Sequence, residues 1–201
     1  MKLLIAFINF IKISSNIKKN YNIVFYSENK NYFVLFDDII INLLKENNIS
    51  IIYISSELND QGLKIINKNF FSYYLGRGNF FAWIVKNLNA DLLITSTPDL
   101  GTSKFEKSSK IKHYIYIQHS LISLHKGYLK NSFKYFDTVF CCGQHHKKEL
   151  LKIIKYHKYE NINTLEHGYP IIEKLIDTKQ SYQKKHNENI ILIAPTWGNR
   201  E

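Results

Sequence analysis

The feature that most constrains the fold is a regular alternation of short apolar runs with longer amphipathic segments. Apolar runs of strand length lie at residues 22–26, 49–54, 70–75, 91–95, 113–117, 137–140 and 162–165. Segments with apolar residues at helical spacing lie between and after them, at 33–45, 62–67, 79–89, 129–135, 144–156 and 171–178. This order is typical of βαβ units. The sequence therefore predicts an α/β fold: a Rossmann-like parallel sheet with helices on both faces.

The same pattern divides the chain of 201 residues into three parts. Residues 1–178 form the predicted Rossmann-like domain, and the polar run 179–188 is typical of an interdomain linker. Residues 189–201 begin a second, incomplete domain, because the apolar run 189–194 reads as a strand. A strand without neighbours cannot bury both of its faces. We therefore expect a second half, in further chain or in a partner chain, to complete the fold.

The apolar stretch Met1–Ile13 has three interpretations. It is shorter than the ~20 residues that a membrane-spanning helix needs. It reads best as a first strand or helix of the domain, and the alternatives are an interfacial anchor or a signal segment. No small-x-small cleavage site follows it, which weakens the signal interpretation.

The net charge of +10 comes almost entirely from lysine, because Arg77 and Arg200 are the only arginines. Arginine leads in the bidentate recognition of bases and phosphates, so no nucleic-acid partner is expected. The charge suits an anionic membrane surface or a phosphate-rich substrate, although a coding bias toward Lys, Asn and Ile would also produce it. Cys141 and Cys142 are adjacent in a predicted strand and point to opposite faces. A reducing, cytosolic compartment fits these two cysteines better than a disulfide framework.

Polar residues follow two of the predicted strands, at the edge of a parallel sheet where ligands gather. After 91–95 come Thr97 and Asp99, whose hydroxyl and carboxylate suit a polyol or sugar-like acceptor. The competing interpretation is a turn in which Ser and Asp side chains bond to their own backbone.

The second polar segment follows 113–117 and contains His119, Ser120, Ser123 and His125. A histidine directly after a buried strand is well placed as a general base, because its pKa lies near neutrality. We expect His119 to deprotonate an acceptor hydroxyl, with Ser120 and Ser123 orienting it and His125 as a weaker candidate. A serine nucleophile is not favoured, since the G-x-S-x-G elbow is absent.

Two further motifs give only a weak indication of a ligand site. His145 and His146 diverge by about 100° on a helix, unlike the i, i+4 pair of a zinc site, so no metal is expected. Gly76-Arg77-Gly78 lacks the third glycine of a dinucleotide fingerprint, with Phe81 in its place. Arg77 can still contact an anion at the start of the following helix.

Four short motifs together resemble the CDP-glycerol glycerophosphotransferase family, the teichoic-acid polymerases and primases. In order, they are Tyr116–Ser120, Phe136–Phe140 with Gly143 after it, Gly168–Pro170 and Ile193–Trp197. The resemblance runs from about residue 22 to the end of the chain. It implies a GT-B architecture of two Rossmann-like domains with a cleft between them, of which this chain is the N-terminal half.

The resemblance also implies an activity: transfer of glycerol phosphate from CDP-glycerol to a polymeric or lipid-linked acceptor by peripheral proteins at the inner membrane face. His119 matches the histidine thought to serve as catalytic base, and Ala194–Trp197 match the opening of the donor-binding domain. Ser120 stands where many members have glycine, which suggests a different acceptor. The family's donor site lies mostly in the second domain, so we expect the 201-residue chain to be inactive alone.

The first interpretation is thus a transferase of teichoic-acid or capsule type, present as its acceptor-side domain and without a cofactor. Its substrate is CDP-glycerol or another nucleotide-activated donor, its acceptor is polymeric or lipid-linked, and its location is cytoplasmic and peripheral at an anionic membrane surface. One alternative is a GT-B glycosyltransferase of surface polysaccharide synthesis with a nucleotide-sugar donor. Another is a non-catalytic membrane-surface or polysaccharide-binding module.

Overall fold

The computed structural model describes residues 2–16, 21–46, 49–181, 191 and 193. Its strands are β1 (Tyr21–Ser27), β2 (Ile49–Ser55), β3 (Phe70–Tyr74), β4 (Ala90–Thr95), β5 (Ile111–Ile117), β6 (Thr138–Cys141) and β7 (Asn163–Glu166). Its α-helices are α1 (Lys2–Asn16), α2 (Asp37–Leu43), α3 (Asn79–Asn87), α4 (Leu124–Gly127), α5 (Gln144–His157) and α6 (Pro170–Ser181). Two 3-10 helices, η1 (Lys30–Leu35) and η2 (Gln61–Lys64), complete the described elements.

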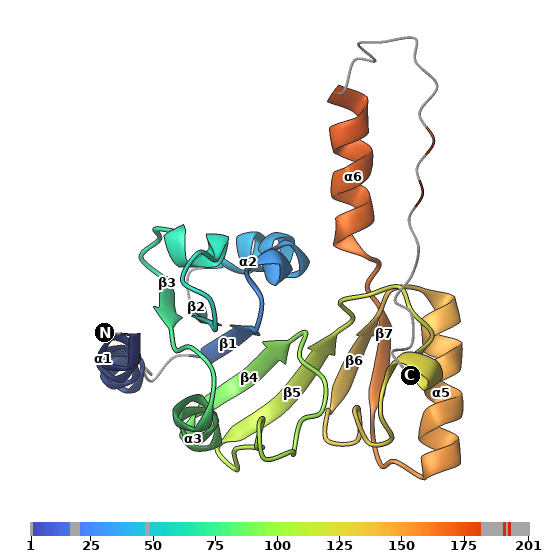
Figure 1. Cartoon of the computed structure of the whole chain (residues 1–201), viewed down its shortest axis with the longest axis horizontal. Coiled ribbons are helices and arrows are strands. Elements are labelled where there is room, and N and C mark those ends of the chain that lie inside the picture. Colours follow the sequence, from blue (N-terminus) through green and yellow to red (C-terminus); the bar gives the residue numbers. More distant parts are fainter. Residues whose placement is uncertain (1, 17–20, 47–48, 182–190, 192, 194–201) are drawn as a thin grey trace.

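The strands form one sheet in the order β3-β2-β1-β4-β5-β6-β7, and every neighbouring pair is parallel (Figure 1). The first six positions follow the strand order of a Rossmann fold. The chain moves outward from β1 to β3 and then returns to place β4 on the other side of β1. The predicted α/β fold with a Rossmann-like parallel sheet is confirmed.

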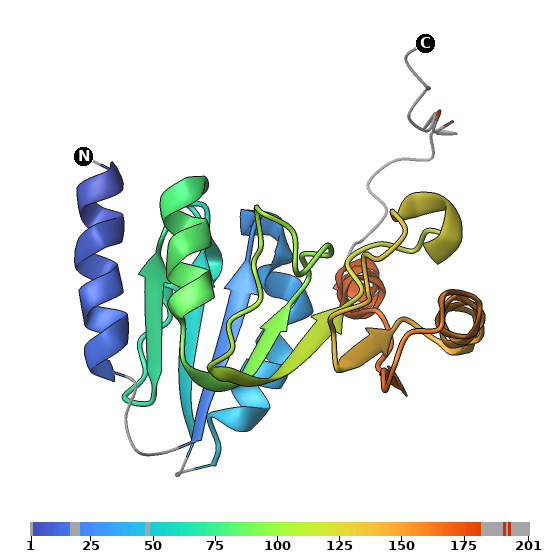
Figure 2. The same ribbon diagram turned by 90° about the horizontal axis from the view of Figure 1, so that it is seen from below.

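Both faces of the sheet are covered, because successive strand side chains point to opposite sides. Val24 and Tyr26 of β1 belong to one apolar cluster, which α1, α3 and α5 complete. Ile23 and Phe25 of the same strand belong to the other, which η1 and α2 complete. The edge-on view in Figure 2 shows α1 and α3 side by side on one side of the sheet.

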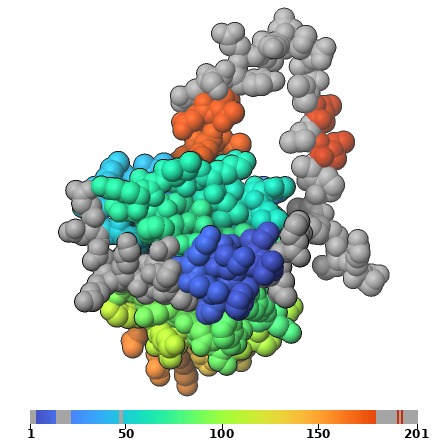
Figure 3. All heavy atoms as spheres, turned by 90° about the vertical axis from the view of Figure 1, so that its left-hand side faces the viewer, coloured from blue at the N-terminus to red at the C-terminus, as the bar shows by residue number. Residues whose placement is uncertain are grey.

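Within the stretch Met1–Ile13, residues 2–13 fall in the first helix of the domain, in agreement with the first interpretation. Ala6 and Ile13 are buried, and the ring of Phe10 lies 5.0 Å from that of Trp83 on α3. The opposite face of α1 is open, and Leu4 is 63% exposed (Figure 3, blue). Within the described residues, none of the helices has both the length and the apolar character needed to cross a bilayer.

Three of the predicted helices differ from the structure. The segment 33–45 is split into η1 and α2, and 62–67 holds only the short η2. The helix predicted at 129–135 is wrong, because that segment is a series of turns, whereas α4 was not predicted. Asn131 has a left-handed φ of 78°, which interrupts a right-handed helix. A backbone hydrogen bond of 3.1 Å from the Asp99 amide to the Ser132 carbonyl ties the turns to the loop after β4.

The predicted boundary after residue 178 falls inside α6, which continues to Ser181. The rest of the expected linker and most of the expected strand 189–194 lie outside the described residues, as does Ala194–Trp197. The expected second domain, 189–201, therefore stays a prediction.

Candidate functional site

His119 lies at the carboxyl end of β5, and its imidazole is held from several sides. Its Nδ1 is 3.0 Å from the hydroxyl of Tyr116, and the Tyr32 ring centroid is 5.2 Å away. Burial lowers the pKa of His119 below its ordinary value, and a hydrogen bond to the Ser96 backbone opposes part of that effect. The ring is therefore neutral at pH 7, which is the form that can accept a proton.

A network of hydroxyl groups fixes this histidine from the core side. The Tyr116 hydroxyl is 3.0 Å from that of Tyr128, which in turn accepts a 2.9 Å hydrogen bond from Nε2 of Gln118. Gln118 also donates to the carbonyl of Ser120, whose own hydroxyl is 3.4 Å from that of Tyr128. Burial raises the pKa of Tyr116 well above its ordinary value, so its hydroxyl stays protonated. The network can thus fix the orientation of the imidazole.

Two of the motifs quoted for the family resemblance meet at this histidine. The Tyr169 hydroxyl donates a 2.9 Å hydrogen bond to the His119 carbonyl, across 50 positions of sequence. Gly168 precedes it with a φ of 87°, a conformation that glycine adopts without strain. The turn 168–170 therefore supports the backbone that carries the imidazole.

Thr97 and Asp99 lie in the loop after β4, where they line a cavity of about 1160 Å³. Asp99 has a left-handed φ of 64°, and its carboxylate accepts a 2.5 Å hydrogen bond from the Ser132 hydroxyl. The Asp99 carboxylate therefore ties the loop to Ser132, a long-range contact and not the bond to its own backbone that the turn interpretation expected. Thr97 Oγ1 is buried and makes no hydrogen bond of good geometry to a described residue. His119 is not one of the lining residues.

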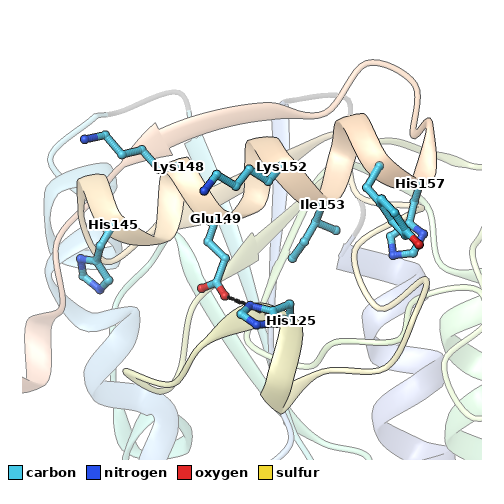
Figure 4. Close-up of a pocket in the computed structure, with 8 residues that line it drawn as sticks. His125, His145, Lys148, Glu149, Lys152, Ile153 and His157 are labelled. Carbon is cyan, nitrogen blue, oxygen red and sulfur yellow. Dashed lines mark hydrogen bonds and ion pairs between the residues drawn. The ribbon is translucent and has the colours of Figure 1, made fainter.

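His125 lies elsewhere, on a second cavity of about 620 Å³ between α4 and α5. The Ser123 hydroxyl donates a 2.6 Å hydrogen bond to Glu149, and the His125 imidazole contacts the same carboxylate (Figure 4). Burial of Glu149 alone would raise its pKa, but hydrogen bonds from Ser123, Leu124 and His125 lower it to about 2. The structure thus places the predicted substrate-binding residues in three groups.

Two residues that follow strands, Glu28 and His167, were not predicted as site residues from the sequence. Glu28 directly follows β1 and lines the larger cavity, and the rule that singled out Thr97 and His119 applies to it equally. His167 follows β7, and its Nε2 is buried without a partner among the described residues. Nε2 of His113, inside β5, lies 2.8 Å from the Thr138 hydroxyl on β6.

Comparison with known proteins finds no matching family model, no matching curated protein and no matching solved structure. A Rossmann-like sheet hosts many unrelated activities, so the fold alone does not select one. In the described part of the chain, no group of three or more His, Cys, Asp or Glu side chains is arranged to hold a metal ion. The case for a function depends on the geometry around His119 and on the order of the motifs.

Proposed function

We propose that this chain is the acceptor-side domain of a transferase that moves glycerol phosphate from CDP-glycerol to a cell-surface polymer or a lipid-linked acceptor. The observation that supports this most is the position of His119 at the carboxyl edge of the sheet, neutral and held by Tyr116. A GT-B arrangement then brings a donor-binding domain over this edge, so that the donor meets the acceptor beside the imidazole.

In this reaction the acceptor oxygen bonds to the phosphorus of glycerol phosphate, the pyrophosphate P–O bond breaks and CMP leaves. The acceptor proton passes to His119. If Nδ1–H donates to Tyr116 and Tyr116 donates onward to Tyr128, Nε2 carries the free lone pair. In that tautomer the Tyr116 hydroxyl holds Nδ1–H and leaves Nε2 to act as the base.

The proposal places the protein at the inner face of the cell membrane, without a spanning segment in the described part. The open face of α1 supports this, since Leu4, Phe7 and Ile11 are each at least half exposed. Helices with an exposed apolar face and nearby lysines bind anionic bilayer surfaces. Sedimentation with phosphatidylglycerol vesicles tests this, and Leu4→Ser with Ile11→Ser should abolish it. Unchanged binding would contradict this location.

The activity is tested by CMP release from CDP-glycerol with a glycerol-phosphate oligomer as acceptor. The assay uses the complete reading frame that contains these residues, because the donor site is expected outside them. His119→Asn should lower kcat by about 10²-fold or more, the usual contribution of a general base. Tyr116→Phe should lower it by a smaller factor, and Tyr156→Phe, at an 82% exposed position, serves as the matched control.

Full activity in His119→Asn would refute the role of the imidazole. Turnover of a nucleotide sugar but not of CDP-glycerol would favour the glycosyltransferase alternative. An absence of turnover with either donor, combined with vesicle or polysaccharide binding, would favour a non-catalytic binding module.

A further inference from the structure

The cavity of about 1160 Å³ lies where the order of the strands reverses. The chain leaves β1 toward β2 and later returns to place β4 on the other side of β1, so two loops diverge at the carboxyl ends of these strands. Ligands of open α/β sheets bind at such a point. Glu28 follows β1 and Thr97 follows β4, and both line the cavity. The topology therefore marks this cavity as a ligand site independently of His119.

The inner wall of the cavity carries groups that suit hydroxyls. The Glu28 carboxyl lies beside the Thr97 hydroxyl and close to the charge of Arg77. Burial raises the pKa of Glu28, while Thr97 and Arg77 act in the opposite direction. Thr97 Oγ1 is buried and has no hydrogen bond of good geometry among the described residues. The Thr97 hydroxyl faces the Glu28 carboxyl, and its oxygen can accept a hydrogen bond from a ligand hydroxyl.

Cations from three separate segments line the rest of the cavity: Arg77 before α3, Lys104 after β4 and Lys130 before β6. Nη2 of Arg77 donates to the Glu28 carbonyl at 2.7 Å and to Glu57 at 3.0 Å, which fixes the guanidinium while leaving it 62% exposed. Lys104 and Lys130 form no ion pair with described residues.

The acidic groups on the cavity are Glu28 and Asp99. The Asp99 carboxylate is occupied by the Ser132 hydroxyl. Because Arg77 is paired with Glu57, the positive charge most available to a ligand comes from Lys104 and Lys130, and the lining combines it with the hydroxyl-binding pair of Glu28 and Thr97.

We propose that this cavity binds a phosphate ester that carries free hydroxyl groups. Arg77, Lys104 and Lys130 hold the phosphate, while Glu28 and Thr97 bind a hydroxyl. The inference extends the proposed function, in which such an ester is a unit of the acceptor. The cavity is too large for a single glycerol phosphate, so more than one unit of an acceptor chain fits.

The test is calorimetric titration of the purified chain with sn-glycerol 3-phosphate, inorganic phosphate, glycerol and glucose 1-phosphate. We expect both esters to bind more tightly than either phosphate or glycerol, and the better ester identifies the source as a polyol phosphate or a sugar phosphate. The double variant Lys104→Met, Lys130→Met should weaken binding of the ester by about tenfold or more. Lys126→Met, Lys155→Met removes the same charge from exposed positions on α4 and α5 and should leave the affinity unchanged.

Glu28→Gln separates the two halves of the site. It should reduce the preference for the ester over inorganic phosphate, while inorganic phosphate itself binds equally well or more tightly because a negative charge is removed. Equal losses in the two double variants, or an unchanged preference in Glu28→Gln, would overturn the proposal. This test measures ligand binding and not turnover. The proposal for the cavity can therefore fail while CMP release still depends on His119, and it can hold even if His119 is dispensable for CMP release.

Discussion

Replacement of Glu149 by glutamine should destabilise the segment that carries Ser123 and His125. The Glu149 carboxylate accepts hydrogen bonds from the Ser123 hydroxyl at 2.6 Å and from the Leu124 amide at 2.9 Å, and it also contacts the His125 imidazole. It thereby caps α4, whose first amides have no partner within the helix. A glutamine side chain has one acceptor oxygen fewer and turns an NH₂ group toward these donors.

The size of the effect follows from the pKa of Glu149, which falls from 4.5 to about 2. That difference corresponds to about 3.4 kcal/mol at 1.36 kcal/mol per pKa unit. The side chain is 20% exposed and His125 is 60% exposed, so solvent screens the interaction. We therefore expect Glu149→Gln to lower the free energy of unfolding by about 1–2 kcal/mol at pH 7.

The pH dependence provides a second, independent check. A carboxylate whose folded pKa is lowered contributes fully above its unfolded pKa of 4.5, and the contribution is lost as the pH falls through about 2. Urea unfolding of the wild type and Glu149→Gln at pH 7 and pH 3.5 should thus show a difference that shrinks at the lower pH. Glu46→Gln, at an exposed position, is the control. A difference below about 0.5 kcal/mol at pH 7, or one that does not change with pH, would refute the reasoning.

Asp60→Ala should lower the free energy of unfolding by about 3–5 kcal/mol in urea, because this fully buried carboxylate accepts hydrogen bonds from Tyr53, Ser55 and a backbone N–H. A loss below about 1 kcal/mol would show that these donors find other partners. Gly101→Ala should cost about 1–3 kcal/mol by the same measurement, since φ is 92° and the new Cβ would lie 2.4 Å from a tyrosine ring. NMR of its ring protons should show that His119 titrates below pH 6.5, because burial lowers its pKa. The contribution of the neutral ring to the free energy of unfolding is complete above pH 6.5 and is lost as the pH falls through the folded pKa. Titration at or above 6.5 would mean that the ring is not desolvated.

The segments predicted best are those whose apolar spacing has a single interpretation. The apolar runs 22–26, 49–54 and 113–117 are strands, and the regular spacing of 144–156 is a helix. The segment 129–135 has comparable apolar spacing, yet it forms turns because Asn131 adopts a left-handed φ and Ser132 bonds to Asp99. Nothing local to 129–135 indicates a partner more than 30 positions away.

The residues of the candidate site were likewise predicted only in part from the sequence. The sequence placed His119 and Thr97 at strand ends, because polar residues directly after a buried apolar run lie at the edge of a parallel sheet. It did not show that Ser123 and His125 pack against α5, away from the His119 network.

The sequence by itself determined the strands and the longer helix 144–156, since the period of their apolar residues has a single interpretation. Only the tertiary structure decided which loops meet. Glu28 and Thr97 come together because β1 and β4 are neighbours in the sheet although β2 and β3 separate them in the chain. The order of the strands depends on the packing of the whole sheet and its helices, and a local pattern carries no record of it.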